Sequence, residues 1–181
     1  LGTREFFVSD ENFLLDRPRA MRLLELIETH DKDWGFGIFS SANALRKYSM
    51  YDLVRLGVSR VWIGLEGENS RYQKLHGTDT KTLVRELQSH GICVVGSNII
   101  GLENHTPENI DQVIDYAVSH KADFNQFMLY TPLPGTPLYR ELNDAGKILS
   151  EDELPLADRH GQYRFAHRHP HIAPGQETDF L

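Results

Sequence analysis

The stretch WIGLEGEN, residues 62–69, decides the fold class, because an apolar run within it ends on two acids, Glu66 and Glu68. Continuous apolar runs are typical of strands in parallel sheets that are covered on both faces. A buried carboxylate without a partner is costly, so either a partner meets it there or the end of the strand opens onto a polar pocket. The stretch therefore predicts a parallel strand that ends on a carboxylate with a polar contact.

Four more apolar runs accompany this one, and helical patterns separate them. The five runs are residues 6–10, 34–40, 61–67, 92–101 and 124–130. Thr136 before Pro137, and Ser49 before Asp52, are typical of helix starts, whereas Gly57 is typical of a helix end. This alternation predicts an α/β fold with parallel strands, either an open doubly wound sheet or a whole or partial (β/α) barrel. No glycine-rich phosphate loop follows the first run, which argues against a dinucleotide-binding fold.

The composition narrows the function classes. The 181 residues have a net charge of −7 and a pI of about 5.7, which gives no support for a nucleic-acid binder. No run approaches the roughly 18 apolar residues of a membrane span. The single cysteine, Cys93, rules out a disulfide framework and lies in an apolar run, where core packing is its expected role. These features predict a soluble domain of cytoplasmic type.

Every predicted strand brings polar residues, which follow it, end it or lie within it. Because the carboxyl ends of parallel strands meet at one edge, these side chains should form one binding rim. Other roles stay open: Asp10 and Asn12 could cap a helix, Ser41 and Asn43 could form turns, and Glu66 could form a loop salt bridge. The rim residues are Asp10, Glu11, Asn12, Ser40, Ser41, Asn43, Glu66, Ser97, Asn98, Asn125 and Gln126.

Four stretches together resemble the radical S-adenosylmethionine (SAM) superfamily. They are FFVSDENF (6–13), WIGLEGEN (62–69), SNIIGLENHTPENI (97–110) and LYTPLPGTPLYRE (129–141). The resemblance extends from Arg4 to about Leu149. It is to the branch whose members often have a cobalamin-binding domain upstream, with the methylthiotransferases as relatives.

The resemblance implies a partial, TIM-like (β/α) barrel of parallel strands. In such proteins SAM lies across the carboxyl ends of the strands beside a [4Fe–4S] cluster, and its reduction generates a deoxyadenosyl radical that abstracts hydrogen from the substrate. The resemblance makes Glu66 a SAM ligand, and a carboxylate suits a ribose diol or an ammonium group. It implies further SAM-binding positions at Asp10 or Glu11, Ser41, Asn43, Asn98 and Leu133.

The chain departs from this family at the cluster. Three cysteines in a CxxxCxxC loop should follow the first family strand, and this chain has only Cys93, inside a later strand. We therefore expect a C-terminal portion that lacks the first β/α unit, with a partial barrel over residues 1–149 and a C-terminal extension over residues 150–181. The cluster ligands would lie outside this chain, which is expected to be inactive by itself. Cobalamin in an upstream domain stays open.

Two other functions remain as alternatives. One is a cluster-free barrel remnant that binds a ligand or a partner. The other is a metal hydrolase that uses His167, His169 and His171, although packing or substrate contacts are favoured for these histidines and no metal site is predicted. For the radical SAM reading, the partners would be an unidentified substrate and an electron donor such as flavodoxin or ferredoxin, with no membrane. Loss of the first strand would also expose the edge at residues 5–10, which invites self-association.

Overall fold

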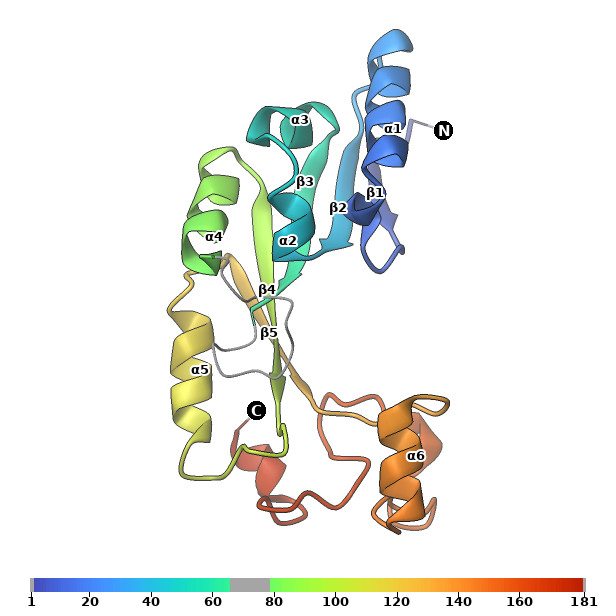
Figure 1. Cartoon of the computed structure of the whole chain (residues 1–181), viewed down its shortest axis with the longest axis vertical. Coiled ribbons are helices and arrows are strands. Elements are labelled where there is room, and N and C mark those ends of the chain that lie inside the picture. Colours follow the sequence, from blue (N-terminus) through green and yellow to red (C-terminus); the bar gives the residue numbers. More distant parts are fainter. Residues whose placement is uncertain (1, 66–78, 181) are drawn as a thin grey trace. The chain divides into compact units, whose positions relative to one another are not determined.

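The structure, a computed structural model, describes residues 2–65 and 79–180, and one five-stranded sheet runs through them in the order β1-β2-β3-β4-β5 (Figure 1). The strands are β1 (Glu5–Val8), β2 (Gly35–Ser40), β3 (Val58–Gly64), β4 (Cys93–Ile100) and β5 (Phe124–Leu129). Neighbouring strands from β1 to β4 pair in parallel, with Phe39 opposite Trp62 and Gly64 opposite Ser97. All five apolar runs thus form strands, and the predicted α/β class with a parallel sheet is confirmed.

Helices follow the strands in chain order. They are η1 (Phe13–Leu15), α1 (Arg17–Thr29), α2 (Ala42–Leu45), α3 (Met50–Arg55), α4 (Thr80–Ser89), α5 (Ile110–Val118), α6 (Pro137–Asp144), η3 (Leu156–Asp158) and η4 (Gln176–Asp179). The caps at Ser49 and Thr136 are confirmed, because each hydroxyl accepts a backbone N–H three residues on. Asn12 occupies the N-cap position of the next helix, η1, but its side chain makes no capping hydrogen bond there. The cap of α1 is Asp16, which accepts from the N–H of Arg19.

The described residues form two compact units, which are treated separately below. The first comprises Leu1–Ser97 and Tyr116–Gln126, and the second comprises Asn98–Asp115 and Phe127–Leu181. The division falls within β4, β5 and α5. This division is defined by which residues contact one another. It does not test the domain boundary predicted at residue 149, which stays a prediction.

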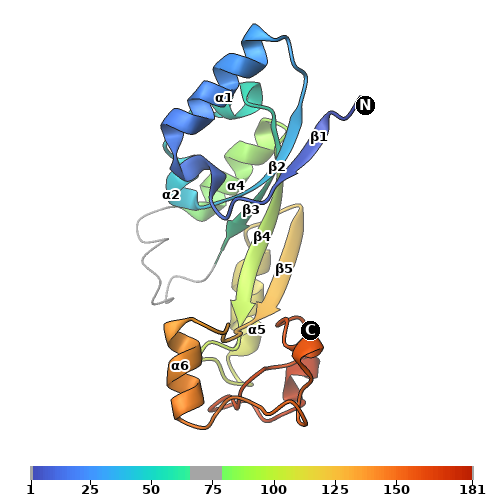
Figure 2. The same cartoon turned by 90° about the vertical axis from the view of Figure 1, so that its right-hand side faces the viewer.

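The core of the first unit lies between one face of the sheet and the helices. Figure 2 shows α1, α2 and α4 on the same side of β1, β2 and β3. Ile38, Val61 and Ile63 are fully buried and point to that side, where they join buried leucines of the helices. Alternation along a strand sends their neighbours to the opposite face. Phe39 and Trp62 therefore lie on the face away from these helices.

Strand β1 forms one edge of the described sheet. Its residues pair with β2 on one side, and the exposed fraction of Phe7 is 55%. An edge strand with exposed apolar side chains is a template for pairing with another chain. The prediction that this edge promotes self-association is consistent with this exposure and stays a prediction.

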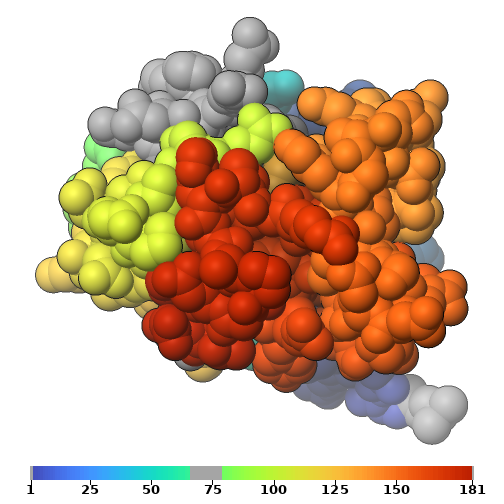
Figure 3. All heavy atoms as spheres, turned by 90° about the horizontal axis from the view of Figure 1, so that it is seen from below, coloured from blue at the N-terminus to red at the C-terminus, as the bar shows by residue number. Residues whose placement is uncertain are grey.

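The C-terminal extension packs within the second unit. Phe165 and Ile172 are buried against Ile100 and Leu129, at the ends of β4 and β5. The N–H of Leu149 bonds to the carbonyl of Ala166. In Figure 3 the orange segment with α6 accordingly lies beside the red C-terminal residues. The extension therefore packs on the core of this unit.

Candidate functional site

A pocket of about 350 Å³ opens in the first unit at the carboxyl ends of β2 and β3. Its volume lies at the lower end of the range for small-molecule sites. The wall combines polar side chains from the segment after β1 and from the strand ends with two aromatic rings. The lining residues are Glu11, Asn12, Phe39, Ser40, Ser41, Ala42, Trp62, Ile63, Gly64 and Ser97. The predicted rim of polar strand ends thus exists for these residues.

Asn12 links the ends of β1 and β2 on the polar side of the pocket. Its Nδ2 donates to Oγ of Ser41 over 3.2 Å, and its Oδ1 accepts from Oγ of Ser40, also over 3.2 Å. Ser41 is at the same time the N-cap of α2, since its Oγ accepts from the N–H of Ala44. A capping hydroxyl has a fixed position, so the turn after β2 holds this side of the pocket in place.

The two candidate acids after β1 have different surroundings. Asp10 does not line the pocket: its Oδ1 accepts from the N–H of Asn12 over 2.9 Å, and its Oδ2 pairs with Arg19 over 2.7 Å. These hydrogen bonds, first that of Asn12 and then that of Arg19, lower the pKa of Asp10. Glu11 is exposed and lines the pocket. Of this pair, Glu11 is therefore the acid in a position to contact a ligand there.

The remaining predicted positions are distributed over the chain. Asn43 is exposed on α2 and is not among the residues that line the pocket. Asn98, with 3% of its surface exposed, and Leu133, with 58%, belong to the second unit. Glu66 lies outside the described residues. The structure thus brings Glu11 and Ser41 together at one pocket and leaves the roles of the other positions as predictions.

Sequence reasoning missed the aromatic wall. The rings of Phe39 and Trp62 lie 5.6 Å apart between centroids, and Phe7 contacts both at 5.2 Å and 5.4 Å. Edge-to-face contacts of this kind fix ring positions. The signal in the sequence was the alternation of Trp62 with the buried residues Val61 and Ile63, which places its ring on the opposite face.

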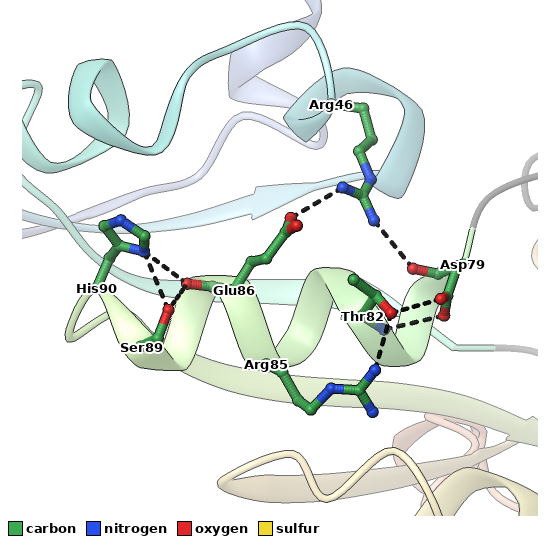
Figure 4. A network of polar contacts seen from close by, with 7 residues as sticks. All are labelled: Arg46, Asp79, Thr82, Arg85, Glu86, Ser89 and His90. Carbon is green, nitrogen blue, oxygen red and sulfur yellow. Dashed lines mark hydrogen bonds and ion pairs between the residues drawn. The ribbon is translucent and has the colours of Figure 1, made fainter.

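An ion pair holds the helices beside the site. Arg46, which follows α2, pairs with Glu86 of α4 over 2.8 Å and donates to the carbonyl of Asp79 over 3.1 Å (Figure 4). Asp79 caps α4 by accepting from Thr82, and the Thr82 hydroxyl and N–H lower the pKa of Asp79. The start of α4 is thus fixed to the end of α2, directly after the segment that contains Glu66.

The histidines of the C-terminal extension pack against aromatic rings. His167 is buried, with Phe165 at 5.5 Å and Tyr130 at 6.3 Å between ring centroids. His169 stacks on Phe165, and its Nε2 lies 3.1 Å from the carbonyl oxygen of Leu102. Within residues 2–65 and 79–180, no group of three or more His, Cys, Asp or Glu side chains is arranged to hold a metal ion. The structure therefore supports the packing role and gives no support for the metal hydrolase.

The residues present do not fit a [4Fe–4S] cluster. Such clusters need several thiolates, and the sequence contains one cysteine, Cys93, half-buried in β4. The pocket, in contrast, offers hydroxyl, amide and carboxylate groups together with aromatic rings, which fits a polar ligand that also has a flat ring. No helix in the described part of the chain is long and apolar enough to cross a membrane.

Comparison with known proteins gives the class. No family model matches the chain. A solved radical SAM methyltransferase, TsrM of Kitasatospora setae with cobalamin and a [4Fe–4S] cluster bound, superimposes with a TM-score of 0.63 at 16% identity, over 78% of this chain and 28% of that one. The chain thus has the fold of radical SAM enzymes.

Two curated relatives are similar in sequence. The bacteriochlorophyllide d C-8(2)-methyltransferase of Chlorobaculum tepidum is 26% identical over 81% of this chain and 34% of its own length. An anaerobic magnesium-protoporphyrin IX monomethyl ester cyclase of Cereibacter sphaeroides is 33% identical over 81% of this chain and 26% of its own length. The resemblance to the radical SAM superfamily is confirmed. The chain spans about a third or less of the length of these relatives.

Proposed function

We propose that this chain is the SAM-binding and substrate-binding portion of a radical SAM enzyme that transfers a methyl group or closes a ring. The observation that supports this most directly is the pocket at the carboxyl ends of β2 and β3, with polar groups on one side and Phe39 and Trp62 on the other. Relatives named as methyltransferases and as a cyclase give the reaction classes. Bound SAM would supply the deoxyadenosyl radical, and cobalamin is a further candidate cofactor of the whole enzyme.

The residues of the pocket have distinct roles in this proposal. Ser41 donates to SAM, while Glu11 and Glu66 accept from its hydroxyl or ammonium groups, which a carboxylate does without competition from its own protons. Trp62 and Phe39 exclude water from one side and offer faces for a flat ring. Asn98 and Leu133, which belong to the second unit, are proposed as further SAM-binding positions on the resemblance to the family alone.

Substituting Ser41 tests the proposal. Addition of SAM to the ¹⁵N-labelled chain should shift the backbone amide signals of Ser41 and Ser97, and Ser41→Ala should weaken the binding about threefold to tenfold, the value of one hydrogen bond. Ser49→Ala is the matched control, because Ser49 caps α3 in the same manner but does not line the pocket. Equal weakening by both substitutions would mean that the loss of a helix cap is the cause, and the absence of shifts in the parent would overturn the proposal.

The iron content tests the part of the proposal that concerns the cluster. Because the sequence has one cysteine, the 181-residue chain should contain no iron after anaerobic reconstitution with iron and sulfide. Iron and acid-labile sulfide assays measure this, with the Cys93→Ser variant as the control for adventitious uptake. Stoichiometric iron that is lost in Cys93→Ser would contradict the expectation.

A further inference from the structure

Arg19 is connected to the polar side of the pocket through Asp10 and Asn12. It lies on α1 and is not among the lining residues, but three interactions fix its guanidinium. It pairs with Oδ2 of Asp10 over 2.7 Å, donates to the carbonyl of Phe13 over 2.9 Å, and lies 5.3 Å from the centre of the Phe13 ring. Phe13 is buried in the core, so its contacts with Arg19 hold the guanidinium in a fixed position relative to the core.

Asp10 transmits this position to Asn12. Its second oxygen accepts the N–H of Asn12 over 2.9 Å, which closes a short turn after β1. The turn fixes the backbone of Asn12, and its carboxamide then reaches both Ser40 and Ser41. A continuous path of hydrogen bonds therefore runs from α1 to the wall of the pocket.

The direction of these hydrogen bonds determines what the two serines offer to a ligand. Ser40 donates its only hydroxyl hydrogen to Asn12, so that its oxygen remains an acceptor. The oxygen of Ser41 accepts from Asn12 and from the N–H of Ala44, so its own hydrogen remains to be donated. The pocket thus presents an acceptor beside a donor, which complements two neighbouring hydroxyl groups.

We propose that Arg19 is a positioning residue for this pocket: through Asp10 it orients Asn12, which makes Ser40 an acceptor and Ser41 a donor toward a ligand with vicinal hydroxyls. The inference rests on the proposed function for the identity of the ligand, a nucleoside. Its first part, the orientation of Asn12 by Arg19, depends on no ligand. The two parts can therefore be tested separately.

Adenosine and 2′,3′-dideoxyadenosine serve as probes in titrations followed by NMR. The parent should bind adenosine about threefold to tenfold more tightly than the dideoxy compound, because one or two hydrogen bonds distinguish them. In Arg19→Gln this ratio should fall toward one, and Arg19→Lys should restore part of it, since lysine keeps the charge but not the planar geometry. Arg22→Gln is the matched control, because Arg22 lies on the same helix and pairs with Glu25 instead.

Two measurements without ligand complete the experiment. In Arg19→Gln, but not in Arg22→Gln, the pKa of the Asp10 carboxyl should rise and the carboxamide signals of Asn12 should move. If the parent binds neither probe while these two changes occur, the proposed function fails and the positioning role stands. If the carboxamide signals of Asn12 and the probe ratio are the same in Arg19→Gln as in the parent, the positioning role is overturned.

Discussion

Replacing Gly57 by alanine is expected to destabilise the chain by about 3 kcal/mol or more, because two separate costs add at this position. Gly57 follows α3 with a φ of 85°, in the left-handed region that only glycine adopts at low cost. An added Cβ would also lie 2.0 Å from the carbonyl oxygen of Trp34. Trp34 lies just before β2, and its carbonyl is part of the backbone, so it cannot rotate away as a side chain can. The start of β3 would therefore have to shift.

Gly91 provides the matched control for this experiment. It follows α4 in the same manner with a φ of 78°, but an added Cβ there would meet nothing within 4 Å. Gly91→Ala should therefore cost only the conformational part, about 1–2 kcal/mol. Urea unfolding followed by circular dichroism compares the two variants with the parent. Equal losses would show that the carbonyl of Trp34 does not limit this position.

The fold could be predicted because its signals are local. Five apolar runs became five strands, and the hydroxyls of Ser49 and Thr136 cap the helices that follow them. Thr106 before Pro107 shows the same Thr-Pro pattern that begins α6, but α5 begins only at Ile110, and the carbonyl of Thr106 accepts from the N–H groups of Asn109 and Ile110. The pattern by itself therefore places the start of α5 too early. Such boundary errors arise because a turn and the first turn of a helix share the same hydrogen bond.

The site could be predicted only in part. Polar residues at strand ends indicated where a pocket should open, and Ser41 and Glu11 line it. The sequence left Asp10 and Glu11 as equal candidates for the acid that contacts a ligand. The choice depends on Arg19 of α1, which forms an ion pair with Asp10 and so leaves Glu11 as the candidate. The pocket positions of Phe39 and Trp62 could not be predicted, because an aromatic residue within an apolar run cannot be distinguished by hydrophobicity from its neighbours that pack in the core.

His167 should make the chain sensitive to mild acid. Only 5% of its surface is exposed, and no partner for its Nδ1 is found among the described residues. Burial, and after it the charges of His169 and Lys147, lowers the pKa of His167 to about 4. The folded state therefore holds this ring neutral, whereas the unfolded chain protonates it near an ordinary pKa of about 6.5.

The direction in which the stability changes with pH follows from the number of protons that the folded and the unfolded chain bind. Between about pH 6.5 and about pH 4 the unfolded chain binds a proton at this ring that the folded chain does not. The stabilising contribution is fully present above about pH 6.5 and is lost as the pH falls to about 4, by up to about 3 kcal/mol. Burial also lowers the pKa values of His105, His120 and His169, so the parent should lose further stability as the pH falls below the ordinary histidine pKa of about 6.5.

The variant His167→Phe isolates the contribution of this ring. Phenylalanine can keep the contacts with Phe165 and Tyr130, and it removes both the unpartnered nitrogen and the proton that it would bind. Its free energy of unfolding, from urea titrations at successive pH values, should fall less steeply on acidification than that of the parent. His160→Phe changes an exposed histidine of the same segment and should leave the slope unchanged. If His167→Phe and the parent lose stability in parallel, His167 is already accommodated as a cation in the folded state, and burial is not what controls its protonation.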